Sequence, residues 1–322
     1  MRTILYIGNK LEHNSSKNVS TIQILGSALE GEGFHVIYAS SKSNKLQRLC
    51  DMIWTCLKAR KKVDYVLIDT YSTQNFYYAL IISQICRLFK LDYIPILHGG
   101  NLEKRLKENP KFSQLIFSHA KWNVAPSVFI KDVFESYGYV NIKFIPNALN
   151  IENYPFTERA SGKIKLLWVR SFSNIYNPIL ALKVVKVLLE KGFEAELCMV
   201  GPDTGDGSFK KVKELSESWH IPVTFTGKLS KKKWTELSKD YNVFLNTTNF
   251  DNMPVSIIEA MALGLPVIST NVGGMPHLIE HGKNGLLVPK NDAMAFVKAI
   301  LDVRSNTELQ KKLVFNARKK VE

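Results

Sequence analysis

The sequence contains little cysteine, no long apolar segment and no low-complexity tract. Four cysteines spread over 322 residues are too few and too scattered for a disulfide framework or a paired CxxC zinc site. The most apolar stretch, Phe76 to Phe89, is interrupted by Gln84 and Arg87 and is too short to span a bilayer. The first eight residues lack the apolar core and cleavage site of a signal peptide. We therefore expect a cytoplasmic protein without a transmembrane segment.

Several common sequence motifs of nucleotide-binding and catalytic sites are also missing. No GxxxxGK[ST] loop, no GxGxxG after a first strand and no GxSxG elbow occurs. The stretch His277-Leu-Ile-Glu-His281 matches the HxxEH pattern of some zinc sites. However, glycines and a proline flank it and leave about one turn of helix, so we expect a structural segment and no metal site.

The composition is that of a globular protein with a strong basic excess. Hydrophobic residues make up 45% and charged residues 22%, and the length suits two domains. The net charge of +14 is divided equally between residues 1–162 and 163–322. Such a balance favours anionic partners such as nucleic acid, an anionic membrane surface or phosphorylated substrates. A solvated basic surface without one partner is the alternative. No interleaving of aromatic and basic residues of the RNA-recognition kind occurs, so we expect no nucleic acid partner.

Short apolar runs alternate with segments of helical periodicity, which is the pattern of a doubly wound parallel sheet. The first series of expected strands is Ile4–Ile7, Val36–Ala39, Tyr65–Asp69, Tyr93–Leu97, Trp122–Ala125 and Lys143–Ile145. The second series is Lys165–Val169, Glu196–Val200, Val223–Phe225, Val243–Asn246, Val267–Ser269 and Leu286–Val288. We therefore predict an α/β protein of two facing Rossmann-like domains, residues 1–155 and 156–322, with the ligand site in the cleft between them.

The segment from Asn242 to Pro289 is the most informative for function. A strand ends in a polar loop, and Pro254 is expected at the first helical position, where its missing N–H costs nothing. The start of this helix is a ready anion site. Asp251 and Glu259 add two carboxylates beside it, which suits a ligand with both phosphate and sugar hydroxyls. The alternative is that Asp251 caps the helix and Glu259 is a surface residue.

This segment resembles the C-terminal signature of glycosyltransferase family 4, which are retaining enzymes of the GT-B fold. The matching stretches are Glu259-Ala-Met-Ala-Leu-Gly-Leu-Pro-Val-Ile268, Gly273-Gly274 and Asn284-Gly-Leu-Leu-Val288. Further matches follow in order at Ile145-Pro-Asn-Ala-Leu-Asn150, Trp168-Val-Arg170, Met199-Val-Gly-Pro202 and Phe225-Thr-Gly227. The resemblance covers the chain strongly from Phe144 onward and weakly before it.

The resemblance implies a hexosyltransferase-type enzyme that moves a sugar from a nucleotide-diphosphate sugar to an acceptor hydroxyl with retention. The second domain would bind this donor without a metal ion or cofactor. Arg170 and the backbone from Asn252 to Ser256 would hold the diphosphate, and Glu259 would hold the ribose. The backbone residues of this donor-binding stretch are Asn252, Met253, Pro254, Val255 and Ser256. Asp251 and His98 would position the transferred sugar, and together with Glu259 they are the expected catalytic residues.

Two departures from the family pattern concern site residues: a carboxylate whose reach is shorter by one methylene and a missing positive charge. Asp251 stands where the family has glutamate, and Ile175 stands where a phosphate-binding lysine usually follows the arginine. Lys228 or the run Lys231–Lys233 is a candidate for the second positive charge, although a solvated helix start is the simpler interpretation of that run.

The first domain is expected to form the acceptor side. The loop Gly8–Lys17 replaces the usual glycine-rich loop after the first strand. His98, followed by Gly99 and Gly100, ends the fourth expected strand and occupies the family's position for a histidine near the donor sugar. We expect Gly99 to contribute to the donor site.

The resemblance implies assembly of cell-surface polysaccharide or a lipid-linked glycan. The helix that carries Leu46, Leu49, Ile53, Trp54 and Leu57 beside a basic run favours peripheral contact with the inner face of the membrane. Packing of that helix on its own sheet is the alternative. Two other functions stay open, a catalytically silent binding subunit and a nucleotide-sugar epimerase. Because the sequence ends inside an expected helix, we also expect a missing final helix or loosely tied domains.

Overall fold

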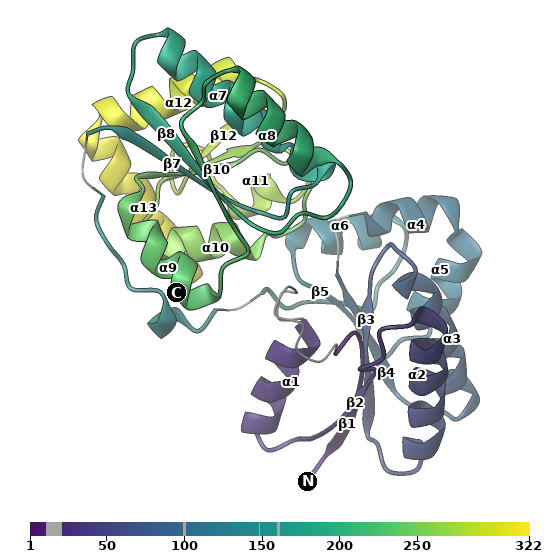
Figure 1. Ribbon diagram of the computed structural model, residues 1–322. Coiled ribbons are helices and arrows are strands. Elements are labelled where there is room, and N and C mark those ends of the chain that lie inside the picture. The colour runs from purple at the N-terminus through teal and green to yellow at the C-terminus, as the bar shows by residue number, and fades with distance from the viewer. Residues whose placement is uncertain (11–20, 99–100, 148, 160–161) are drawn as a thin grey trace. The chain divides into compact units, whose positions relative to one another are not determined.

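The computed structural model describes residues 1–10, 21–98, 101–147, 149–159 and 162–322. The chain divides into two compact units, Met1–Pro146 and Asn147–Glu322 (Figure 1). The predicted boundary lies after residue 155, whereas the segment from Asn147 packs with the second unit. This assignment matters because the segment brings Tyr154 into the core of the second unit.

The N-terminal unit contains a six-stranded parallel sheet with the strand order β2-β1-β3-β4-β5-β6. The change of direction in this order falls between β1 and β3, where the chain leaves two neighbouring strands toward opposite sides. The strands are β1 (Thr3–Ile7), β2 (His35–Ala39), β3 (Tyr65–Thr70), β4 (Tyr93–Leu97), β5 (Asn123–Ala125) and β6 (Ile142–Phe144).

Helices cover the two faces of this sheet unequally. Helix α1 (Thr21–Gly31) packs on one face through Ile22, and the other helices cover the opposite face (Figure 1). These are α2 (Lys45–Ala59), α3 (Asn75–Leu88), α4 (Leu102–Glu108), α5 (Pro110–Phe117) and α6 (Val128–Ser136). In α2, Leu49 and Ile53 pack against the core whereas Leu46 and Trp54 are exposed. Packing on the sheet therefore accounts for Leu49 and Ile53 of α2. It does not account for Leu46 and Trp54, which face solvent.

The C-terminal unit contains a second six-stranded parallel sheet, with the order β12-β11-β10-β7-β8-β9. This is the Rossmann order, and its change of direction falls between β7 and β10. The strands are β7 (Ile164–Val169), β8 (Ala195–Val200), β9 (Val223–Gly227), β10 (Val243–Asn246), β11 (Val267–Thr270) and β12 (Leu286–Val288). All strand positions agree with the sequence prediction to within a few residues.

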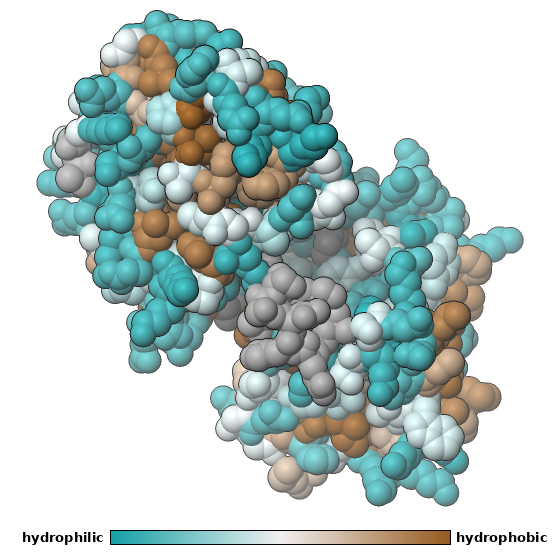
Figure 2. Space-filling view, viewed as in Figure 1, coloured by the Kyte–Doolittle hydropathy of each residue, from teal (hydrophilic) through white to brown (hydrophobic). Residues whose placement is uncertain are grey.

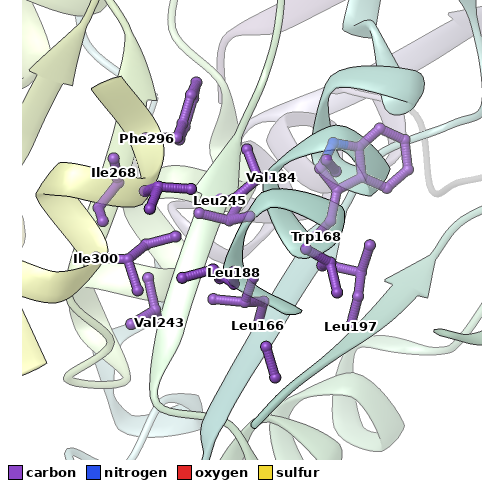
Figure 3. Packing of buried hydrophobic residues seen from close by; sticks show 14 of the residues in the cluster. Leu166, Trp168, Val184, Leu188, Leu197, Val243, Leu245, Ile268, Phe296 and Ile300 are labelled. Atoms are coloured by element: carbon purple, nitrogen blue, oxygen red, sulfur yellow. The ribbon is translucent and has the colours of Figure 1, made fainter. Parts of the chain in front are cut away.

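The strands of the second sheet other than β9 send alternate side chains to two apolar clusters. Leu166 and Trp168 of β7 join one cluster, and Leu167 between them joins the other. Figure 3 shows the first cluster, in which Leu245 and Ile268 lie beside residues from the covering helices. The first face is covered by α7 (Pro178–Glu190), α8 (Ser208–Ser218) and α12 (Ala293–Ser305), and the second by α9 (Lys231–Leu237), α10 (Val255–Ala262), α11 (Met275–Leu278) and α13 (Thr307–Val321).

The predicted α/β class with two Rossmann-like sheets is confirmed. Helices α4 and α5 were not predicted, because α4 is short, highly charged and separated from α5 only by Asn109 before Pro110. In open parallel sheets ligands bind beyond the carboxyl ends of the strands where the order changes direction. Ligand sites are therefore expected at the carboxyl ends of β7 and β10 in one unit and of β1 and β3 in the other.

Candidate functional site

Arg170 follows the end of β7, directly at the change of strand order in the second unit. Its backbone N–H donates to the carbonyl of Val200 over 3.0 Å, which continues the β7–β8 pairing by one residue. Its guanidinium lies 4.5 Å from the ring centroid of Tyr176. Burial lowers the pKa of Arg170 to about 10, and Tyr176 opposes that shift. The side chain therefore stays cationic at neutral pH, and a buried cation at this position can bind an anion.

Asp251 supplies the counter-charge of Arg170 from the loop after β10. The two side chains form an ion pair, and both are largely buried. The other carboxylate oxygen of Asp251 accepts the backbone N–H of Asn252 over 2.8 Å. The structure therefore rejects the alternative in which Asp251 caps the helix, because Pro254 holds the N-cap position. An anionic ligand of Arg170 has to share that cation with Asp251.

The glycine pair fixes the backbone of the Asp251 loop by close approach. Gly274 donates its N–H to the carbonyl of Asp251 over 2.9 Å. A β-carbon on Gly274 would lie 1.9 Å from the carbonyl oxygen of Asn252, and one on Gly273 would lie 2.1 Å from that of Asp251. Gly273 also has a φ of +53°, a conformation that favours glycine. Gly273 and Gly274 therefore hold the carboxylate loop of this chain.

Replacing Gly274 by alanine is expected to destabilise the second unit and to displace Asp251. Overpacking of this kind costs about 1–3 kcal/mol of unfolding free energy. Urea denaturation measures the loss. Gly31→Ala is the matched control, because a β-carbon there meets open space. Equal stability of both variants would contradict the close approach.

Helix α10 begins at Val255, one residue later than predicted, with Pro254 as its N-cap. By helix geometry the N–H groups of the first turn have no acceptor within the helix. The hydroxyl of Ser256 is buried and has no hydrogen-bond partner among the residues that the structure describes. The N–H of Asn252 is already bonded to Asp251, and Pro254 has none to offer. The donors that this stretch offers therefore include the N–H groups of Val255 and Ser256 and the Ser256 hydroxyl.

Glu259 lies on α10 and is 1% exposed, so it is not the surface residue of the alternative hypothesis. Its Oε1 accepts the hydroxyl of Tyr154 over 2.8 Å and also pairs with the ammonium of Lys231. Burial first, and the charge of Glu259 second, raise the pKa of Tyr154, so that hydroxyl stays a donor. The backbone carbonyl of Tyr154 in turn accepts Arg318 of α13 over 2.7 Å. Asp251 is thus paired with Arg170, and Glu259 is paired with Lys231.

Of the candidates for the missing positive charge, Lys231 is placed beside Glu259. At Ile175, the usual place of that charge, the backbone carbonyl accepts the N–H of Asn249 over 2.7 Å and the side chain is partly exposed. This contact ties the segment after β7 to the loop after β10. Burial lowers the pKa of Lys228. Arg170 is thus a cation that this unit places at the change of strand order.

In the N-terminal unit, His98 follows β4 and is 9% exposed. Its Nε2 lies 2.8 Å from Oδ1 of Asp69 at the end of β3. The same oxygen accepts the hydroxyl of Tyr6 over 3.0 Å, and the ring of Tyr71 stacks on the imidazole at 5.0 Å. Gly99 and most of the Gly8–Lys17 loop lie outside the described residues. His98 therefore belongs to a polar cluster at the change of strand order of the first sheet.

The HxxEH segment has structural contacts. Nδ1 of His281 accepts the backbone N–H of Leu287 over 3.0 Å, and Glu280 pairs with Lys283 and Lys320. In the described ranges, histidine, cysteine and carboxylate side chains form no group that could hold a metal ion.

Sequence reasoning missed the partners of the site residues. Tyr154, Asp69, Tyr6 and Tyr71 were not named, and Lys231 was considered for the diphosphate rather than for Glu259. A signal was available for Asp69, which is an acidic residue at the end of a buried strand. For Tyr154 the sequence signal is weaker, because the residue stands out only as an aromatic side chain within a polar stretch.

Two parallel Rossmann-type sheets, with a buried arginine and a helix start at the change of strand order, define a protein of the GT-B class. The chain belongs to the family of glycosyl transferases group 1, whose family model matches residues 150–320. The predicted family resemblance is thereby confirmed.

Relatives and solved structures agree with this assignment. The amylovoran biosynthesis glycosyltransferase AmsK of Erwinia amylovora is 40% identical over 74 residues, 23% of this chain and 18% of AmsK. The UDP-Gal:alpha-D-GlcNAc-diphosphoundecaprenol alpha-1,3-galactosyltransferase of Escherichia coli is 22% identical over 280 residues, 78% of this chain and 70% of that protein. The structure of HepE of Anabaena in complex with UDP-glucose superposes with a TM-score of 0.78 at 16% identity, covering 100% of this chain and 94% of HepE. The 40% match spans less than a fifth of AmsK, and the likeness to HepE concerns the fold.

Proposed function

We propose that the protein is a glycosyltransferase that moves a hexosyl group from a UDP-sugar to an acceptor hydroxyl with retention. The observation that carries the proposal is the buried, cationic Arg170 at the change of strand order, paired with Asp251 in the loop that leads into α10, the helix that carries Glu259. A cation and free helix N–H groups bind a diphosphate, and a buried carboxylate accepts hydroxyls. Family membership, the UDP-Gal in the name of the Escherichia coli relative and the UDP-glucose bound to HepE support this donor class.

In this mechanism the protein acts by orientation and electrostatics. Arg170 and the first turn of α10 stabilise the negative charge that grows on the diphosphate as its bond to the anomeric carbon breaks. Glu259 holds the ribose through its hydroxyls. Asp251 and His98 hold the hydroxyls of the transferred sugar. The acceptor oxygen forms the new glycosidic bond to the anomeric carbon, and its proton passes to the departing diphosphate of UDP.

A panel of nucleotide sugars tests the proposal. Incubation with each donor, followed by measurement of UDP release and thermal shift, separates a transferase from a silent subunit, which binds without release. An epimerase would interconvert the sugars without releasing nucleotide. NMR of the anomeric proton of the product decides retention. Absence of both binding and release across the panel would contradict the proposed function.

Asp251→Asn is expected to lower turnover by about 10- to 100-fold, since a charge-assisted bond to the sugar is lost. UDP affinity should be kept or rise, because Arg170 loses the anion that competes for it. Asp251→Glu restores the residue usual in the family, and we expect it to retain most of the turnover. Steady-state kinetics and UDP titration check both variants. A parallel loss of UDP affinity and turnover in Asp251→Asn would show that the residue only builds the loop.

Transfer is expected to persist in EDTA. The diphosphate charge is met by Arg170 and helix N–H groups, so no divalent ion is required in this mechanism. UDP release measured before and after chelation, with magnesium or manganese added back, checks this. Activity that disappears on chelation and returns with either ion would mean that the diphosphate site is assigned wrongly.

We further propose a lipid-linked acceptor at the inner face of the cytoplasmic membrane. The acceptor in the name of the Escherichia coli relative is a diphosphoundecaprenol. In the described part of this chain no helix is long and apolar enough to cross a bilayer. The contact that we propose is peripheral. Exposed apolar side chains gather where α3 and α5 lie in the N-terminal unit (Figure 2). We name this the α3–α5 face, and its apolar residues are Leu88, Phe89, Phe112 and Leu115.

Helices α3 and α5 are neighbours at the α3–α5 face, and basic residues accompany its apolar side chains. Gln84 of α3 donates to the carbonyl of Leu115 over 3.2 Å, and the guanidinium of Arg60 lies 5.2 Å from the ring of Phe89. Apolar side chains surrounded by cations suit a bilayer with anionic headgroups. The exposed lysines at this border are Lys61, Lys62, Lys90 and Lys111.

Vesicle sedimentation tests this contact. The protein should bind vesicles that contain phosphatidylglycerol and should not bind neutral phosphatidylcholine. The variant Leu88→Asp/Phe112→Asp should lose most of this binding. The control is Ile24→Asp, because Ile24 is 58% exposed on α1 and lies away from the α3–α5 face. Equal loss with the control would contradict the assignment.

A further inference from the structure

Asp69 is a buried carboxylate with two hydrogen-bonding neighbours at the carboxyl ends of three adjacent strands. Its side chain is 2% exposed, and its Oδ1 is 2.8 Å from Nε2 of His98 and 3.0 Å from the hydroxyl of Tyr6. Tyr6 lies on β1, Asp69 on β3, and His98 follows β4. The cluster therefore sits at the change of strand order, where open parallel sheets bind ligands.

The rest of the cluster restrains these groups. The N–H of His98 donates to the carbonyl of Thr70 over 2.8 Å, which fixes the histidine backbone beside β3. The ring of Tyr71 stacks on the imidazole with an interplanar angle of 28°. A β-carbon on Gly8 would lie 2.5 Å from Oδ2 of Asp69, so this position accepts only glycine if the carboxylate keeps its place. The imidazole is thus held in one orientation at the sheet edge.

The direction of the hydrogen bonds follows from the chemistry of the groups. An ionised carboxylate only accepts hydrogen bonds, so Nε2 of His98 has to carry the proton. Burial first and the charge of Asp69 second raise the pKa of Tyr6, which keeps its hydroxyl a donor to the same carboxylate. A neutral imidazole protonated on Nε2 has its lone pair on Nδ1. Nδ1 is then the nitrogen that can accept a hydrogen bond from a ligand.

We propose that Asp69 is a positioning residue that fixes His98 in the Nε2-protonated tautomer, so that Nδ1 accepts a hydrogen bond from a hydroxyl of the transferred sugar. The sugar contact rests on the proposed function, whereas the tautomer does not. Without the carboxylate the ring would populate both tautomers, and the one with a proton on Nδ1 cannot accept this bond. The ligand class is a neutral sugar hydroxyl.

The full-length protein with ¹⁵N-labelled histidine tests the tautomer without any ligand. Long-range ¹H–¹⁵N correlation spectra, with His98 assigned by a His98→Gln variant, should show the proton on Nε2 in the wild type. Asp69→Asn offers an amide NH₂ that can donate to an unprotonated Nε2, so the tautomer preference should shift. The control is Asp132→Asn, an exposed aspartate on α6, which should leave the His98 signals unchanged.

Kinetics with the UDP-sugar found in the donor panel test the role. Asp69→Asn should lower kcat by about 10- to 100-fold, the size of a lost charge-assisted bond, with UDP affinity unchanged. If that variant fails to fold, Tyr6→Phe removes one donor to Asp69 and should give a smaller fall in kcat. A proton on Nδ1 in the wild type overturns the proposal. An unchanged kcat in a folded Asp69→Asn variant also overturns the proposal. The same holds if the variant loses UDP affinity by the same factor as kcat. If the wild type transfers no sugar, the proposed function and with it the sugar contact fail, while the spectra still decide the tautomer.

Discussion

Replacing Glu259 by glutamine is expected to weaken UDP binding by about 10- to 100-fold for each ribose hydroxyl bond that the carboxylate makes. The neutral amide loses the charge-assisted component of these bonds and turns an NH₂ donor toward the hydroxyl of Tyr154 or of the ribose. The ammonium of Lys231 is 58% exposed and stays solvated when its partner is removed. We therefore expect a large loss of affinity with a small loss of stability, measured by UDP titration and thermal unfolding.

Two comparisons make this result specific. Glu280→Gln changes an exposed carboxylate that also pairs with lysines, and it should leave UDP affinity unchanged. With 2′-deoxy-UDP, the difference between wild type and Glu259→Gln should shrink, because one of the hydroxyls is absent from the ligand. A Glu259→Gln protein that binds UDP as tightly as the wild type would leave the carboxylate a structural role only.

Replacing Arg170 by methionine is expected to lower turnover by about 100- to 1000-fold, which is the loss typical when one preorganised charge-stabilising donor is removed from an active site. Burial lowers the pKa of Arg170 only to about 10, so a full positive charge is removed at neutral pH. Arg304→Met is the matched control, since Arg304 is exposed and stacks on Phe193 in the same unit. Single-turnover UDP release from the donor sugar measures the effect.

A destabilised loop could also lower turnover in Arg170→Met, because the variant leaves the largely buried Asp251 without its cation. Breaking a buried ion pair on one side costs about 3–5 kcal/mol. The double variant Arg170→Met/Asp251→Asn removes the unpaired charge and should recover stability, while its turnover should stay well below that of Asp251→Asn alone. A double variant that turns over as fast as Asp251→Asn would mean that Arg170 serves only to neutralise Asp251.

The sheets and the positions of Arg170, Asp251 and Glu259 were predictable because they depend on local pattern. A buried parallel strand is a run of apolar residues, and the residue that follows it must lie at the ligand-binding edge. The short charged helix α4 lacks such a pattern and was missed. Pro254 was placed one residue too far into its helix, because a proline suits both positions before and at the helix start.

The partners of these residues were not predictable because they depend on strand order and on distant loops. Asp69 and His98 meet only because β3 and β4 are neighbours and the loops after them converge. Tyr154 reaches Glu259 across 105 residues of sequence. The sequence offers Lys231 as a source of positive charge for phosphate. The packing of α9 against the sheet brings it to the carboxylate of Glu259 instead.

The anchoring of Tyr154 by α13 has a consequence for how the protein is made. Arg318 follows Tyr154 by 164 residues, and one of its nitrogens donates to the carbonyls of both Tyr154 and Ala262 over 2.7 Å. During synthesis the N-terminal unit has all its described strands by residue 144 and can fold early, since domains fold as units in order of emergence. The surroundings of Glu259 are completed only when α13 has left the ribosome. A nascent chain therefore completes the surroundings of Glu259 only after α13 has emerged, well after the strands of the N-terminal unit.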